Sequence, residues 1–116
     1  MNINFNERLK QILSETTQSL CQVYRDQLKA VILYGSFARG TNTEDSDIDI
    51  LILVDASDQQ LREYAEKLND ISTDLALKYM KVFSIIDVKY KEYMDWKAVS
   101  PFYRNVDKEG IVLYAA

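Results

Sequence analysis

Three aspartates occupy positions at which a protein core does not ordinarily accept a carboxylate. Asp47 and Asp49 open one apolar, β-branched run, and Asp87 lies within another. Side chains two residues apart on a strand share a face, so we expect Asp47 and Asp49 to point at one small volume and Asp87 to complete it from a neighbouring strand. Three like charges would repel one another unless a cation lay between them, and carboxylate oxygens suit Mg²⁺. The acids therefore predict a Mg²⁺ site. A pair of Mg²⁺ ions at such a site would serve phosphoryl chemistry.

A glycine-serine corner precedes these acids. Gly35 closes a short apolar run, and Ser36 is expected to cap one helical turn that carries Arg39. Glycine lets the backbone approach a ligand, while hydroxyl and amide donors at a helix start suit the oxygens of a triphosphate. A forked guanidinium at Arg39 could add a cation for the phosphates, although an exposed arginine can equally pair with Glu44 or Asp45. We expect Gly35, Ser36 and Arg39 to hold a nucleoside triphosphate.

Each of these residues also has an ordinary structural interpretation. Asp47 and Asp49 can be acids that meet solvent at a strand start, and Asp87 can simply face water. The pair 35–36 can serve as a tight turn and a helix cap, a use that is compatible with phosphate binding. The spacing between the corner and the acids favours the functional interpretation.

Apolar periodicity predicts the elements that must position the site. We expect helices over residues 6–27, 57–80 and 91–96, and strands over 29–34, 47–54, 81–90 and 110–114. The segment 41–46 reads as a polar loop, and Pro101 as a break between elements. Helices and strands in this order favour an α/β (α+β) fold, with a small mixed sheet flanked by helices. We expect residues 1–116 to form a single domain.

Composition excludes several function classes. The 116 residues include 14 basic and 18 acidic side chains, a net charge of −4, which argues against direct binding of nucleic acid. The chain has no histidine, so carboxylates, hydroxyls and a cation must carry any catalysis. It shows neither a long apolar run nor a signal peptide, so we expect a cytoplasmic protein with no membrane association.

The corner and the acids together match a known pattern. Gly35-Ser36, ten further residues and then Asp47-Ile48-Asp49 resemble the Gly-Ser-x10-Asp-x-Asp signature of the polymerase-β-like nucleotidyltransferases. The wider strings 35–40 and 46–51 look like the minimal nucleotidyltransferase (MNT) branch of that superfamily. The segments 101–106 and 109–114 look like the closing part of the same branch. The resemblance covers nearly the whole chain and implies the polymerase-β-like nucleotidyltransferase fold.

This resemblance also implies roles and partners. In the family, residues matching Asp47 and Asp49 bind the catalytic Mg²⁺ ions, and a third acid, matched here by Asp87, assists as metal ligand or as base toward the acceptor hydroxyl. Residues matching Gly35 and Ser36 form the phosphate corner. Members of the MNT branch are commonly antitoxins paired with a HEPN-domain ribonuclease toxin. The resemblance therefore implies transfer of AMP from ATP to a tyrosine of a HEPN toxin, within a hetero-oligomer with that toxin.

Two other functions would use the same residues. One is the catalytic subunit of a small-molecule nucleotidyltransferase, with an antibiotic hydroxyl presented by a separate binding subunit. The other is a non-catalytic antitoxin that neutralises its partner by binding alone. The motifs are common to all three functions, so the sequence leaves the acceptor and the nucleobase open.

Overall fold

The computed structural model describes residues 6–116. The helices are α1 (Glu7–Tyr24), α2 (Ser36–Arg39), α3 (Asp58–Tyr79), α4 (Tyr90–Trp96) and α5 (Pro101–Glu109), with a 3-10 turn, η1, at Arg25–Gln27. The strands are β1 (Leu28–Tyr34), β2 (Ile48–Val54), β3 (Phe83–Lys89) and β4 (Ile111–Ala115). Apart from their exact ends, all the elements predicted from the sequence are present. One helix, α5, was not predicted.

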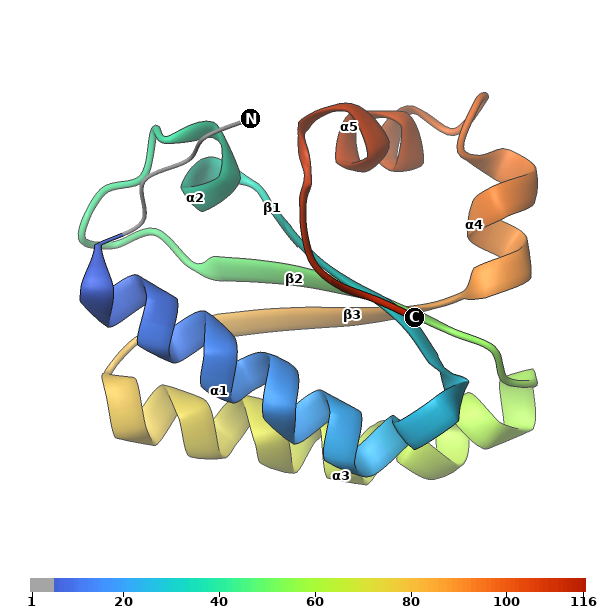
Figure 1. The fold of residues 1–116 in the computed structure, drawn as a ribbon, viewed down its shortest axis with the longest axis horizontal. Helices are drawn as coiled ribbons and strands as arrows, with labels where there is room; N and C mark the ends of the chain where they lie inside the picture. Colours follow the sequence, from blue (N-terminus) through green and yellow to red (C-terminus); the bar gives the residue numbers. More distant parts are fainter. Residues whose placement is uncertain (1–5) are drawn as a thin grey trace.

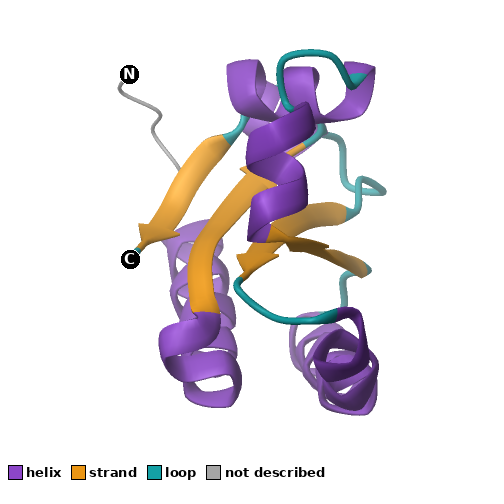
Figure 2. Cartoon of the chain, turned by 90° about the vertical axis from the view of Figure 1, so that its right-hand side faces the viewer, coloured by secondary structure: helices purple, strands orange, loops and turns teal. Residues whose placement is uncertain are grey.

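The four strands form one mixed sheet in the order β3-β2-β1-β4. Strand β1 runs antiparallel to β2 and to β4, while β2 and β3 are parallel. Helices α1 and α3 cover one face, and α4 and α5 lie over the other, with short α2 at the end of β1 (Figures 1 and 2). The expectation of a small mixed sheet flanked by helices is confirmed.

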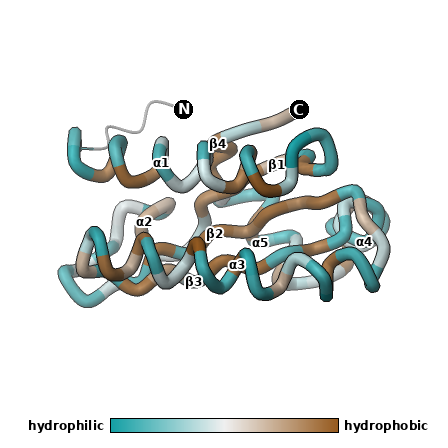
Figure 3. The backbone as a smooth tube through the Cα atoms, turned by 90° about the horizontal axis from the view of Figure 1, so that it is seen from below, coloured by the Kyte–Doolittle hydropathy of each residue, from teal (hydrophilic) through white to brown (hydrophobic). Residues whose placement is uncertain are grey.

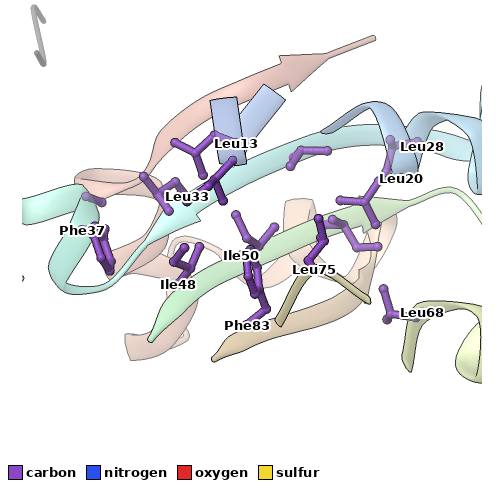
Figure 4. Close-up of a cluster of buried hydrophobic side chains, with 14 of the residues drawn as sticks. Leu13, Leu20, Leu28, Leu33, Phe37, Ile48, Ile50, Leu68, Leu75 and Phe83 are labelled. Carbon is purple, nitrogen blue, oxygen red and sulfur yellow. The ribbon is translucent and has the colours of Figure 1, made fainter. Parts of the chain in front are cut away.

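The sheet separates two apolar layers, because the side chains of a strand alternate between its faces. The larger layer, between the sheet and α1 and α3, includes Leu20, Leu33, Ile50, Leu75 and Phe83 (Figure 4). The smaller layer lies under α4 and α5 and contains Ala30, Ile32, Leu51, Leu53, Val88, Tyr93 and Val106. Strand β2 contributes side chains to the apolar layers on both faces of the sheet, which explains its continuous apolar run. The backbone coloured by hydropathy shows the apolar stretches concentrated in the interior (Figure 3).

Local caps begin the two long helices. Asn6 accepts a hydrogen bond from the Leu9 amide at 2.7 Å at the start of α1. Ser57 and Gln60 form a reciprocal capping box at the start of α3. Among residues 6–116, none of the helices combines the length and the apolar character that crossing a membrane requires.

Helix α5 corrects the interpretation of Pro101 as a break. Ser100 is the N-cap, its hydroxyl accepting from the Tyr103 amide, and Pro101 takes the first helical turn, where a missing N–H leaves no bond unmade. Val106, only 2% exposed, anchors the helix on the smaller apolar layer. Proline therefore begins a helix here, and this helix covers the sheet next to the predicted site.

Candidate active site

Asp47 and Asp49, which we call the acid pair, lie at the start of β2. Asp49 is the register partner of Tyr34 on β1, and Tyr34 packs against the smaller apolar layer, so Asp49 points to the side of α5. Burial raises the pKa of Asp49, the charge of Asp47 raises it further, and Arg39 acts in the opposite sense. The two carboxylates are therefore close enough to act on each other. Asp47 is exposed, so the acid pair can be reached from solvent.

The glycine corner touches the acid pair directly. Gly35 has φ 76° and ψ −158°, a conformation reserved almost entirely for glycine. A Cβ atom at this position would lie 2.3 Å from Oδ2 of Asp49, so no other residue could occupy it without moving the carboxylate. The absence of a side chain at Gly35 thus brings the backbone of the corner against the acid.

Ser36 does not cap α2, contrary to expectation. It is the first residue of the helix, Gly35 takes the N-cap position, and no side-chain cap is made. The carbonyl of Gly35 accepts from the amides of Ala38 and Arg39, each at 3.1 Å. No side-chain hydrogen bond within residues 6–116 engages the Ser36 hydroxyl, which leaves that hydroxyl available to a ligand at the corner.

Arg39 pairs across the site with α5. Its Nη1 atom lies 3.7 Å from Oε2 of Glu109, and both side chains are about half exposed. The alternative partners in the loop, Glu44 and Asp45, make no ion pair with it in the described structure. Arg39 also opposes the rise in the pKa of Asp49, so its positive charge acts on the acid pair as well as on Glu109 of α5.

Asp87 does not join the acid pair, which corrects the expected three-acid cluster. In the parallel pairing of β2 and β3, Asp87 is the register partner of Ile52 and therefore faces the layer of α1 and α3. Burial raises the pKa of Tyr24 on α1, and the charge of Asp87 raises it further, which agrees with an Asp87 on that side of the sheet. Within residues 6–116, no group of three or more metal-binding side chains of the His, Cys, Asp and Glu types is brought together.

Ser84 takes the place that Asp87 was expected to fill. It is the register partner of Asp49 on β3 and lies on the same face, partly buried. Ser84 and Asp87 are three residues apart, an odd number, so they point to opposite faces of the strand. The sequence interpretation missed Ser84 because the register of β3 against β2 is not visible in the apolar run itself.

A cavity of about 220 Å³ adjoins the corner beneath α5. It is lined by Tyr34, Gly35, Arg39, Phe102, Asn105, Val106 and Glu109. The rings of Tyr34 and Phe102 meet edge to face with their centroids 5.5 Å apart. Sequence reasoning missed the α5 residues of this cavity because it did not predict the helix; the Ser100-Pro101 start and the 3- and 4-residue spacing that follows were the available signal.

The donor set of the acid pair fits Mg²⁺. In phosphoryl-transfer sites this ion is usually held by one or two carboxylates and completes its shell with water and substrate phosphates. Asp47 and Asp49 offer two carboxylates, and burial, followed by the charge of Asp47, raises the pKa of Asp49; a bound cation would offset both effects. The arrangement could therefore neutralise charge at a phosphate held by the corner.

The family model for the nucleotidyltransferase domain matches residues 13–112, a range that contains the corner, the acid pair and all the α5 residues that line the cavity. The chain belongs to this nucleotidyltransferase family. A Methanocaldococcus jannaschii protein assigned as a protein adenylyltransferase is 41% identical to it over 102 residues, which cover 88% of this chain and 94% of that protein. The resemblance found in the sequence is confirmed at the level of the family, and the chain is a nucleotidyltransferase.

Solved structures share the fold of this nucleotidyltransferase. One contains a tri-AMPylated HEPN toxin of Shewanella oneidensis in complex with an MNT antitoxin; the matched chain is 18% identical with a TM-score of 0.55, covering 92% of this chain and 72% of that one. Another is a toxin-antitoxin structure with AMP-PNP, 21% identical with a TM-score of 0.55, covering 88% of this chain and 73% of that one. At these identities the likeness concerns the fold.

Proposed function

We propose that this nucleotidyltransferase is an antitoxin that transfers AMP from ATP to a tyrosine hydroxyl of a HEPN-domain toxin, with which it forms a hetero-oligomer. The contact between Gly35 and Asp49 carries the proposal, because it joins a corner suited to a triphosphate to a carboxylate pair suited to Mg²⁺. The assignment of its relative as a protein adenylyltransferase and the AMPylated toxin in a complex of the same fold support the acceptor class.

The proposed transfer forms one bond to phosphorus and breaks another. The acceptor oxygen attacks the α-phosphorus of ATP, the bond between that phosphorus and the oxygen bridging to the β-phosphate breaks, and pyrophosphate leaves with the displaced charge. Bound Mg²⁺ would neutralise charge on the reacting phosphate. Asp47 and Asp49 would hold the ion, while Ser36 and Arg39 would bind phosphate oxygens and orient the leaving group.

The position of Asp87 bears on the acceptor. The chain has no histidine that could act as a base. Asp87 faces the other side of the sheet, so it cannot act as a base beside the acid pair either. A tyrosine hydroxyl has a pKa of about 10, whereas the pKa of an aliphatic alcohol, like that of water, is far higher. A site without a dedicated base therefore suits a phenol, whose proton can pass to solvent, better than the aliphatic hydroxyl of a sugar or an antibiotic.

The proposal is tested by labelling. We expect the wild-type chain, given ATP labelled in its α-phosphate, Mg²⁺ and the HEPN protein, to label that protein on tyrosine. Asp47→Asn should reduce the rate at least about 100-fold, because transition-state charge loses its stabilisation. Asp45→Asn, an exposed acid two residues earlier in the loop, is the matched control and should label at the wild-type rate.

Two results would contradict the proposal. Full labelling by Asp47→Asn would remove the acid pair from the chemistry. Neutralisation of the toxin by the wild-type chain without any label on the toxin would mean that the antitoxin acts by binding alone.

A further inference from the structure

One face of α5 lines the cavity beside the corner. Phe102, Asn105, Val106 and Glu109 follow one another at steps of three, one and three residues, which places them on one side of a helix. Val106 is buried against the sheet and fixes the helix, so the other three are held at the cavity by a rigid element. The capped start at Ser100 further limits the movement of the first turn.

Two of these side chains present surface or polar groups that contacts within the fold leave partly or wholly unoccupied. Phe102 remains 42% exposed although it packs edge to face on Tyr34. No side-chain hydrogen bond within the described part of the chain involves the Asn105 amide. An aromatic surface and an amide with one donor and one acceptor group therefore meet at a cavity next to the phosphate corner.

These two groups match the chemistry of adenine. Aromatic side chains stack on nucleobases, an interaction worth about 1–3 kcal/mol per base and tolerant of base identity. A carboxamide can donate to one ring nitrogen of adenine and accept from its exocyclic amino group, whereas guanine offers two acceptors on one edge and two donors on another. An asparagine at this position thus favours adenine over guanine.

We propose that the cavity under α5 binds the base of the nucleotide, with Phe102 stacking on the base and Asn105 selecting adenine. This inference rests on the proposed function and adds to it the residues that choose the nucleotide. Arg39 lines the cavity and its charge also acts on Asp49, so one guanidinium serves both the proposed base site and the acid pair. Its ion pair with Glu109 joins the two ends of the nucleotide site.

Base selection is tested by calorimetric titration of the full chain, in Mg²⁺, with non-hydrolysable analogues of ATP and of GTP. The wild-type chain should bind the ATP analogue more tightly. Asn105→Asp replaces the side-chain NH₂ donor by a second acceptor oxygen. The variant therefore loses the hydrogen bond to the adenine ring nitrogen and can accept two hydrogen bonds from the donor edge of guanine. The ratio of the two affinities should therefore shift toward GTP by at least about fivefold. Asn69→Asp, the same change at an exposed position of α3, should leave the ratio unchanged.

Stacking is tested by Phe102→Ala, which should weaken both analogues alike by at least about fivefold. Trp96→Ala removes another exposed aromatic ring outside the cavity and should change neither affinity. Circular dichroism of each variant checks that it folds. Wild-type affinities retained in both Asn105→Asp and Phe102→Ala would overturn this inference alone. A wild-type chain that binds neither analogue would overturn the proposed function together with the inference.

Discussion

Gly35 is the residue at which backbone conformation and the chemistry of the site meet. Its φ of 76° with ψ near −158° suits glycine alone, and its Cα faces the Asp49 carboxylate. Gly40 offers a matched comparison, because it also has a positive φ, 77°, but lies in the ordinary left-handed region with nothing within 4 Å of an added Cβ.

We predict that Gly35→Ala lowers the free energy of unfolding more than Gly40→Ala does. The second change carries only left-handed strain, about 1–2 kcal/mol, whereas the first adds a clash of at least about 1 kcal/mol and displaces Asp49. Urea denaturation of the two variants measures the difference, and nucleotide titration should show a loss only in Gly35→Ala. Equal destabilisation with intact binding in both variants would mean that the corner does not need glycine.

We expect ionised Asp49 to make the folded chain less stable. Burial, and then the charge of Asp47, raises its pKa above the ordinary value of 3.8. The folded chain therefore binds this proton more tightly than the unfolded chain does, so ionised Asp49 lowers the free energy of unfolding at neutral pH. That penalty shrinks as the pH falls through the folded-state pKa and is gone below the ordinary value of 3.8.

We therefore expect Asp49→Asn to raise the thermal unfolding midpoint slightly at neutral pH, with a difference from wild type that shrinks on acidification. The rise should be small because the carboxylate keeps contact with solvent. Thermal denaturation followed by circular dichroism across a pH series, without metal or nucleotide, measures it. A variant less stable than wild type at neutral pH would show that Asp49 has a structural role instead.

At the scale of elements, the strands and long helices followed from the sequence because their signals are local. Alternation in 47–54 and the helical stripe of 57–80 both arise from residues that are close together in the sequence. The face on which Asp87 lies was not predictable in the same way. It depends on the register of β3 against β2, and these parallel strands are joined by the whole of α3. That register is set by how α3 packs, which no pattern within 83–89 reports.

Helix α5 was missed for a different reason. A serine-proline pair after a helix reads equally as a break and as the cap and first residue of a new helix. Phe102, Val106 and Glu109 lie at helical spacing in the sequence. Only the buried anchor and the cavity show that these residues form one face of a helix. The acid pair and the corner, by contrast, were predictable because both sit at the ends of well-marked strands.

The role of α5 can be separated from overall stability by comparing two helix caps. Ser100→Ala and Ser57→Ala each remove a side-chain cap and should each lower the free energy of unfolding by about 1 kcal/mol. Only Ser100→Ala loosens the helix that lines the cavity, so only this variant should bind the ATP analogue more weakly. Equal affinities in the two variants, measured where both are fully folded, would place α5 outside the nucleotide site.

At the scale of the whole molecule, the sheet divides two tasks between its faces. Helices α1 and α3 bury the larger apolar layer and stabilise the domain (Figures 1 and 4). Helices α4 and α5 lie over the smaller layer on the other face, the face to which Asp49 points. Asp87 belongs to the first face and Asp49 to the second. Two aspartates of similar appearance in the sequence should thus differ entirely in function.

That difference is open to one direct measurement: the rate of AMP transfer from labelled ATP to the proposed HEPN partner by Asp49→Asn and by Asp87→Asn, compared with the wild-type chain. We predict a loss of at least about 100-fold in Asp49→Asn and a rate within about twofold of wild type in Asp87→Asn. A severe loss in Asp87→Asn, or full activity in Asp49→Asn, would contradict the assignment of the catalytic centre to the α5 face.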